Sequence, residues 1–158
     1  MSKYDHTKDI TIDLRTGHHF ISVMQQQLNK LHARLSLNYG TFQSELPEQK
    51  MAVRFLQGHE KVLELGGNIG RNTLIIASLL KNKSLVTMET DSSIAQQLRE
   101  NRDSNKLTFP IENSALSTRK MIQKGWDTKH SEVLEPGYFW VNTITYHELV
   151  GGFSLFFF

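Results

Sequence analysis

The first third of the chain carries apolar residues at helical spacing. Between residues 18 and about 36, five apolar side chains follow one another at steps of four, four, three and four, namely Phe20, Met24, Leu28, Leu31 and Leu35. Residues three or four apart share one face of a helix, so this stripe predicts an amphipathic helix that packs on a core or a partner. A second helix is predicted from near Pro47 up to Gly58, because proline suits the first helical turn and glycine ends helices in a left-handed conformation.

From residue 61 onward, short apolar runs alternate with helical spacing. Residues 61–65, 84–89 and 107–112 predict strands, and helical segments lie between them, the second one capped by Asp91 and Ser92. This alternation predicts an α/β fold in which right-handed crossovers join parallel strands. Pro110 has no N–H for a ladder bond, so the third strand is predicted at a sheet edge, in the order 3-2-1.

Beyond Leu116 the pattern is weaker. Residues 117–136 predict an excursion outside the core, whose basic cluster forms a solvated loop or contacts an anionic substrate or RNA. Residues 138–144 predict a strand, and Thr145 with Glu148 has the form of a capping box that opens a helix. The closing residues GGFSLFFF are not expected to continue that helix. The basic cluster consists of Arg119, Lys120, Lys124 and Lys129.

Composition narrows the class of protein. Of the 158 residues, 39% are apolar and 22% charged, as in ordinary soluble domains, and the net charge of +2 disfavours a nucleic-acid partner. The lack of cysteine excludes disulfides and thiolate sites, and adjacent His18 and His19 face different directions on a helix, so no metal site is predicted. A polar N-terminus and the lack of an apolar stretch of about 18 residues predict a cytoplasmic protein without a membrane segment.

The strongest motif is VLELGGNIG at residues 62–70. A strand that stops at a glycine turn and opens a helix directs N–H groups and the positive helix end toward a ligand. The motif is neither a dinucleotide fingerprint, whose later glycines would fall on Asn68 and Arg71, nor a P-loop, which needs Gly-Lys-Ser/Thr. What remains is an acid at the strand end, Glu64, followed by Gly66 and Gly70 at E-x-G-x-x-x-G spacing.

Two further loops follow the neighbouring strands. Glu89 ends the second predicted strand, where a carboxylate can accept hydrogen bonds from both hydroxyls of an unmodified ribose. Asn113, Ser114 and Ala115 follow the edge strand, where polar groups can meet an adenine edge. The carboxyl ends of adjacent parallel strands share one crevice, so these loops predict a nucleoside site.

Three strings carry a resemblance to a known family: VLELGGNIGRNTLIIA, VTMETDSSIAQQLREN and FPIENSALS. They resemble class I S-adenosylmethionine-dependent methyltransferases, and most closely the FkbM-like group, over about residues 45–149. The resemblance implies that the methionine end of the cofactor is cradled by Glu64, Gly66, Gly67, Asn68 and Gly70. It also implies that Glu89 binds the ribose, that Thr90 lies against the adenine and that Asn113, Ser114 and Ala115 line the adenine edge. The matching Asn101 is expected to be structural.

The chain also departs from the family. After WVNTITYHEL the family continues with a strand that carries an Asp-x-Glu-Gly motif and completes a seven-stranded sheet, whereas this chain has no acid after Glu148. We therefore expect a Rossmann-like parallel sheet of the class I methyltransferase type, truncated after the third or fourth strand, with N-terminal helices. The expected divisions are a helical extension (1–44), a partial S-adenosylmethionine-binding domain (45–150) and an atypical apolar tail (151–158).

The resemblance implies a methyltransferase that modifies the oxygen of a small molecule or sugar. No catalytic residue is assigned, because the general base is expected in the half of the family's fold that this chain lacks. The alternative is a catalytically incomplete remnant that acts by binding cofactor or by association. An RNA methyltransferase would need the basic cluster to contact phosphates, and the near-neutral charge disfavours it.

Self-association is the first testable prediction. An apolar strand without a second neighbour exposes backbone N–H and C=O groups that another chain can pair with. We expect the purified chain to form dimers or larger species in light scattering, through the open edge of the first strand and the apolar tail. A monodisperse monomer would contradict this expectation.

Overall fold

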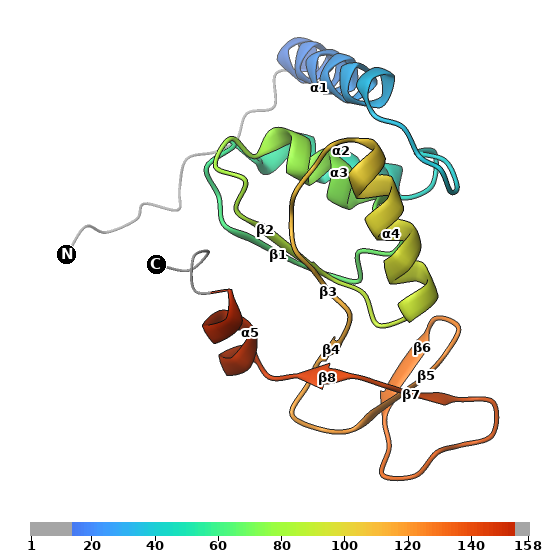
Figure 1. The fold of residues 1–158 in the computed structure, drawn as a ribbon. Helices are drawn as coiled ribbons and strands as arrows, with labels where there is room; N and C mark the ends of the chain where they lie inside the picture. Colours follow the sequence, from blue (N-terminus) through green and yellow to red (C-terminus); the bar gives the residue numbers. More distant parts are fainter. Residues whose placement is uncertain (1–13, 154–158) are drawn as a thin grey trace.

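A three-stranded parallel sheet lies at the centre of the computed structural model, which describes residues 14–153 (Figure 1). Its strands are β1 (Val62–Leu65), β2 (Leu85–Met88) and β3 (Ile111–Glu112), and they lie in the order β1-β2-β3. The register pairs Val62 with Leu85 and Thr87 with Ile111. The predicted strand order and the predicted edge position of the third strand are therefore confirmed.

The third strand is shorter than predicted. Residues 107–112 were expected to be extended, but only Ile111 and Glu112 pair with β2. The preceding residues instead anchor the end of the helix before them: the Leu107 N–H donates to the Arg102 carbonyl, and the Arg102 guanidinium donates to the Phe109 carbonyl. Packing of the Phe109 ring in the core, where it is 4% exposed, takes precedence over strand pairing here.

Five helices surround this sheet in the described part of the chain, and Figure 1 shows α1 to α4 on one side of it and α5 on the other. Alternate residues of β2 face the two sides, as expected for a strand. Leu85 packs with Leu74 and Leu98 from the helices of the first side, and Val86 packs with Leu149 on the second. The helices are α1 (Leu14–Arg34), α2 (Leu46–Phe55), α3 (Arg71–Leu79), α4 (Ser92–Ser104) and α5 (Tyr146–Gly152).

The predicted N-terminal helices are confirmed, with shifted boundaries. Leu28 and Leu31 of α1 are buried with Val53 of α2 and Ile75 of α3, so the stripe faces a helical layer. Phe20 of the same stripe precedes the described side chains. Pro47 lies in the first turn of α2, as predicted.

Asn101 joins three separate segments. Its side chain is fully buried; Oδ1 accepts a hydrogen bond from the Asn38 N–H at 2.7 Å and Nδ2 donates to the Ile69 carbonyl at 2.8 Å. A buried amide with both groups satisfied fixes its neighbours firmly. Asn101 therefore holds the α1–α2 connection and the turn after β1 against α4, in the structural role expected from the sequence.

The excursion predicted for residues 117–136 is instead an ordered antiparallel sheet, in the order β6-β5-β7. Ile122 is fully buried and the adjacent Gln123 is 6% exposed. Because successive residues of a strand face opposite sides, this part of β5 is covered on both faces. The predicted strand at 138–144 is likewise divided, its second part pairing with β4 in another sheet. The strands are β4 (Ala115–Leu116), β5 (Met121–Lys124), β6 (Asp127–His130), β7 (Phe139–Val141) and β8 (Thr143–Ile144).

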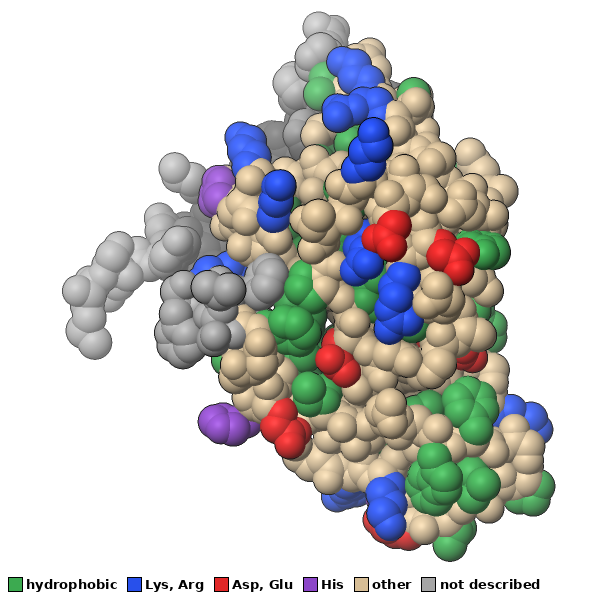
Figure 2. Space-filling model, viewed as in Figure 1, with side chains coloured by type: hydrophobic (Ala, Val, Ile, Leu, Met, Phe, Trp, Pro, Cys, Tyr) green, Lys and Arg blue, Asp and Glu red, His purple; other side chains and the backbone are tan. Residues whose placement is uncertain are grey.

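The surface of this sheet is unusually apolar. Figure 2 shows hydrophobic side chains gathered at the lower right, over the region that these strands occupy in Figure 1. The exposed large residues here include Trp126, Phe139 and Trp140. The basic cluster is not wholly solvated, since Lys129 forms an ion pair with Glu135 at 2.6 Å.

The capping box of α5 is confirmed, since Thr145 and Glu148 bind each other's backbone N–H. The expectation that the helix stops before Gly151 is wrong: α5 runs through Gly152, and the Phe153 N–H donates to the Leu149 carbonyl. Docking of the fully buried Leu149 on β2 outweighs the low helix propensity of glycine. The rest of the apolar tail, residues 154–158, lies outside the described residues, so its predicted role stays a prediction.

Within the described residues, β1 pairs with β2 alone. None of the helices in that part of the chain has both the length and the apolar content needed to cross a bilayer.

A glycine substitution tests the contact between β1 and β2. A Cβ at Gly67 would lie 2.3 Å from Thr87 Oγ1 and 3.1 Å from Leu98, both buried, whereas a Cβ at Gly151 would meet nothing within 4 Å. We expect Gly67→Ala to lower the free energy of unfolding by about 1–3 kcal/mol through overpacking. Gly151→Ala is the matched control and should be neutral or stabilising by up to about 1 kcal/mol. Equal urea midpoints for the two variants would contradict the close approach.

Candidate functional site

The glycine turn after β1 is held closely against the end of β2. The N–H groups of Gly66 and Gly67 both donate to the Met88 carbonyl, at 2.9 and 2.8 Å. Gly70 has φ of 97°, in the left-handed region that favours glycine, and it is the N-cap of α3. Asn68 also adopts a left-handed conformation, with φ of 49°, which asparagine tolerates better than most residues.

The N–H groups of this turn do not point toward a ligand, contrary to what the sequence had predicted. All five, from Gly66 to Gly70, donate within the protein: besides the two bonds to Met88, Asn68 donates to Glu89, Ile69 to the Asn68 side chain and Gly70 to the Gly67 carbonyl. A phosphate cradle uses such groups to bind oxygen atoms of the ligand. Ligand contact at this turn therefore depends on side chains and carbonyl groups and not on N–H groups.

Glu89 lies directly beyond β2, and its side chain faces the glycine turn. The residue is 8% exposed; its Oε2 accepts from the Asn68 N–H at 2.9 Å, and its Oε1 accepts from the Asp91 N–H at 2.9 Å. A carboxylate oxygen has two lone pairs. Oε2 can therefore accept one further bond, whereas Oε1 already accepts a second, longer bond from the Thr90 hydroxyl, at 3.4 Å. The N–H group of Asn68, in the glycine turn, and that of Asp91, before α4, thus hold the two carboxylate oxygens of Glu89 in a fixed orientation.

Glu64 lies under the glycine turn. Its Oε2 accepts from the hydroxyls of Thr73 and Thr87, at 2.6 and 2.8 Å, and its Oε1 accepts from the Asn72 amide at 3.0 Å. Burial raises the pKa of the Glu64 carboxyl group, although the three hydrogen bonds oppose this. Its carboxylate joins β1 to β2 and α3.

Asn113, Ser114 and Ala115 support the site from behind. Asn113 Nδ2 donates to the Glu89 carbonyl at 2.7 Å and to the Thr90 carbonyl at 3.2 Å, and Asn113 Oδ1 accepts from the Ser92 hydroxyl. The Ser114 hydroxyl donates to Glu112, and Ala115 is buried in β4. The contacts of Asn113 fix the backbone of Glu89 and Thr90, whereas the Ser114 bond lies within the segment that follows β3.

A pocket of about 640 Å³ opens at the carboxyl ends of the parallel strands. Of the ten residues predicted as cofactor ligands, four line it and six do not. Those that line it are Gly66, Asn68, Glu89 and Thr90. Those that do not are Glu64, Gly67, Gly70, Asn113, Ser114 and Ala115.

Sequence reasoning missed twelve of the lining residues. They come from the segment before α2, from the glycine turn, from α3 and α4 and from the β5–β6 hairpin. No hydrophobic pattern in the sequence was strong enough to predict this hairpin. For Asp91 and Ile94 the signal was available, since a helix cap that follows a ligand-binding strand lies at the same crevice. The missed residues are Tyr39, Gly40, Glu45, Ile69, Arg71, Asp91, Ile94, Gln97, Gln123, Gly125, Trp126 and Thr128.

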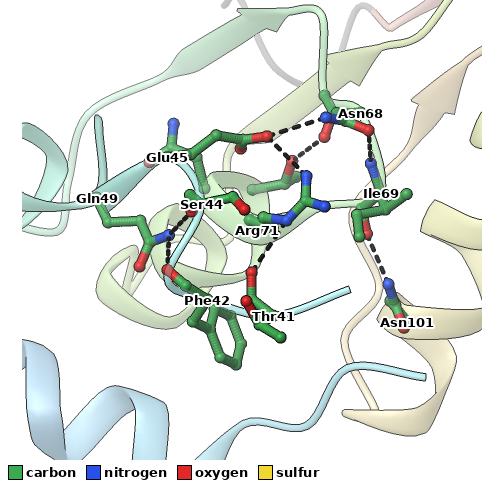
Figure 3. Close-up of polar contacts among 12 residues, drawn as sticks. Thr41, Phe42, Ser44, Glu45, Gln49, Asn68, Ile69, Arg71 and Asn101 are labelled. Carbon is green, nitrogen blue, oxygen red and sulfur yellow. Dashed lines mark hydrogen bonds and ion pairs between the residues drawn. The ribbon is translucent and has the colours of Figure 1, made fainter. Parts of the chain in front are cut away.

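One wall of the pocket is a network around Glu45 (Figure 3). Glu45 Oε1 accepts from Asn68 Nδ2 and from the Arg71 guanidinium, both at 2.9 Å, and Arg71 also donates to the Thr41 carbonyl. Glu45 itself is left-handed, with φ of 64°, a strained conformation for glutamate. The network immobilises the Asn68 side chain at the pocket surface.

The charges that line the pocket are mainly negative. Glu45, Glu89 and Asp91 contribute three carboxylates, and Arg71, which pairs with Glu45, contributes one cation. A hollow lined by one sign of charge concentrates ligands of the opposite sign. The site therefore favours a ligand with hydroxyl donors or positive charge over one that carries phosphates.

The pH dependence of stability tests the position of Glu64. A carboxyl group whose pKa is raised on folding stabilises the fold fully below its unfolded value of 4.5, and this contribution is lost as pH rises through the higher folded value. Gln at this position does not titrate. We expect the unfolding free energy of the wild type, relative to Glu64→Gln, to fall as pH rises from about 4 toward 8. Urea titrations across this range measure it; a constant or rising difference would show that the carboxylate is not desolvated.

Comparison with known proteins gives one similar structure. No protein-family model matches the chain, and no curated protein matches it. A solved structure described as "a putative O-methyltransferase from Klebsiella pneumoniae" is 26% identical to it, with a TM-score of 0.37, over 57% of this chain. The match spans 43% of the length of that protein. The chain is thus similar in part to a protein described as an O-methyltransferase.

Proposed function

We propose that the pocket binds S-adenosylmethionine and that the chain is a class I, Rossmann-like methyltransferase whose acceptor is a hydroxyl group of a small molecule or sugar. The observation that carries this proposal is the Glu89 carboxylate, held by the N–H groups of Asn68 and Asp91 at the mouth of the crevice. Oε2 keeps one lone pair for a ribose hydroxyl, and the neighbouring hydroxyl can replace the long bond from Thr90 to Oε1.

The surroundings of Glu89 support a nucleoside without phosphates. The N–H groups of residues 66–70 are used within the protein, and the lining carries more carboxylates than cations. S-adenosylmethionine has a positively charged sulfonium and a positively charged amino group. Both charges complement Glu45, Glu89 and Asp91, and Arg71, which also lines the pocket, carries the charge that complements the methionine carboxylate.

The methionine end is assigned to the β1 side of the pocket. Gly66, with φ of 80° and open space where a Cβ would point, lets the ligand approach the backbone, and Asn68 presents its amide beside it. Glu64, Gly67 and Gly70 act indirectly, because they set the position of this turn from beneath. Asn113 acts in the same way on Glu89.

When bound, S-adenosylmethionine supplies a sulfonium methyl group that an acceptor oxygen displaces in line. The residues of this chain hold the nucleoside in a fixed orientation, which is the larger part of what such a displacement needs. The acceptor hydroxyl must also lose its proton. We assign no residue to that step.

A second candidate function is cofactor-dependent association without methyl transfer. Leu65, the last residue of β1, is 61% exposed at the edge of the sheet, which is an unusual position for a leucine. Transfer of a labelled methyl group to any acceptor by this chain would eliminate the second candidate. Dimerisation that depends on the cofactor, without transfer, would favour it.

Calorimetric titration with S-adenosylmethionine tests the proposed site. We expect Glu89→Ala to weaken binding by about ten- to a hundredfold, because the loss of one hydrogen bond to a charged group costs about 1.5–3 kcal/mol. Glu112→Gln is the matched control, since Glu112 ends the neighbouring strand but does not line the pocket. Equal affinities for the wild type and Glu89→Ala would refute the assignment of Glu89.

A further inference from the structure

The β5–β6 hairpin forms a wall of the pocket that the glycine turn and Glu89 do not explain. Gln123 and Thr128 are register partners on its two strands, so their side chains leave the same face, and both line the pocket. Gly125 and Trp126, at the hairpin turn, also line it. The hairpin therefore presents one continuous face to the ligand.

Two features of this wall point to a ligand. The Trp126 side chain is 88% exposed, although it lines a pocket in which a flat ring could cover it. Gln123 is 6% exposed, and its Oε1 has no hydrogen-bond partner among the described residues, while its Nε2 donates to the Gly125 carbonyl. The Gln123 Oε1 atom exposes less than 1 Å² of surface. A shielded acceptor without a donor is costly, so rotation of this amide toward a donor of a ligand in the pocket that Gln123 lines would increase affinity.

The order of the strands decides which part of the ligand reaches the hairpin. Glu89 follows β2, the middle strand, so it lies between the glycine turn after β1 and the segment that follows β3. If the ribose of S-adenosylmethionine binds Glu89 and its methionine end lies at Gly66, its adenine extends away from β1, toward the segment that follows β3. Asn113, Ser114 and Ala115 do not line the pocket, which leaves that end to the hairpin.

We propose that the β5–β6 hairpin is the purine-binding wall of the pocket, where the Trp126 indole stacks on adenine and Gln123 Oε1 accepts a hydrogen bond from the 6-amino group. This inference rests on the proposed function and names the residues that recognise the base. The half-buried Thr90 and Ile94 line the same pocket. Aromatic stacking holds any base, whereas an acceptor opposite the 6-position selects an amino group over a carbonyl oxygen.

Tryptophan fluorescence tests the stacking contact. The chain has two tryptophans, and Trp140 lies on β7 and does not line the pocket. In the Trp140→Phe variant we expect adenosine and S-adenosylhomocysteine, but not methionine, to quench the emission of Trp126. The matched Trp126→Phe variant, which keeps Trp140, should show no quenching, and its affinity for S-adenosylhomocysteine should fall by roughly tenfold.

Comparison of adenosine with inosine tests the hydrogen bond. Inosine carries an oxygen in place of the 6-amino group, so we expect the wild type to prefer adenosine by roughly tenfold or more. Gln123→Met keeps the length of the side chain and removes the acceptor, and it should bring the ratio of the two affinities close to one. A purely structural role for Gln123 would weaken both nucleosides alike and leave the ratio unchanged.

The outcomes separate this inference from the proposed function. If S-adenosylhomocysteine binds and Glu89→Ala weakens it, but Trp126 emission and the adenosine preference do not respond as stated, the hairpin inference is wrong and the proposed function stands. If neither S-adenosylhomocysteine nor adenosine binds the wild type, both are wrong. Quenching of Trp126 by methionine alone would place the other end of the cofactor at the hairpin and overturn the assignment.

Discussion

The close approach of the Gly67 backbone to β2 sets the geometry of the whole site. With no side chain at this position, the turn after β1 lies against Thr87, and two of its N–H groups reach one carbonyl, that of Met88. The next N–H along, that of Asn68, is then carried to the Glu89 carboxylate. The turn after β1 and the end of β2 are thus joined into one rigid surface, and the side chains that they carry have little conformational freedom.

The same approach explains why glycine-turn motifs divide into different ligand classes. A turn that keeps its N–H groups free is suited to phosphate oxygens. Here the N–H groups of the turn donate to β2, to Glu89 and to the turn itself, so the group available to a ligand is the ordered Glu89 carboxylate beside the turn. The missing glycines at Asn68 and Arg71 agree with this, because both positions carry side chains that bind Glu45 and close the wall of the pocket.

Local periodicity predicted the parallel sheet well, because β2 and the helices α3 and α4 on either side of it in the sequence each bury a regular set of side chains. It could not place the β5–β6 hairpin, where only Ile122 and Gln123 are buried and charged residues surround them. For the site, Glu89 could be located from its position after a strand. The inward orientation of the Glu64 side chain could not be predicted, because its partners Thr73 and Thr87 are distant in sequence and come close only in the fold. In the same way, Asn113 was identified as a polar loop residue, but only the fold shows that its amide binds backbone and not the pocket.

The connection between α1 and α2 has a consequence for how this protein could be shortened. Tyr39 and Gly40 line the pocket, and the neighbouring Asn38 is attached to α4 through the buried Asn101. A version that begins at residue 45 would retain every strand of the parallel sheet yet leave the hollow open on one flank. The connection between α1 and α2 is thus part of the pocket wall, and the smallest unit able to enclose a nucleoside is larger than the smallest unit able to build the sheet.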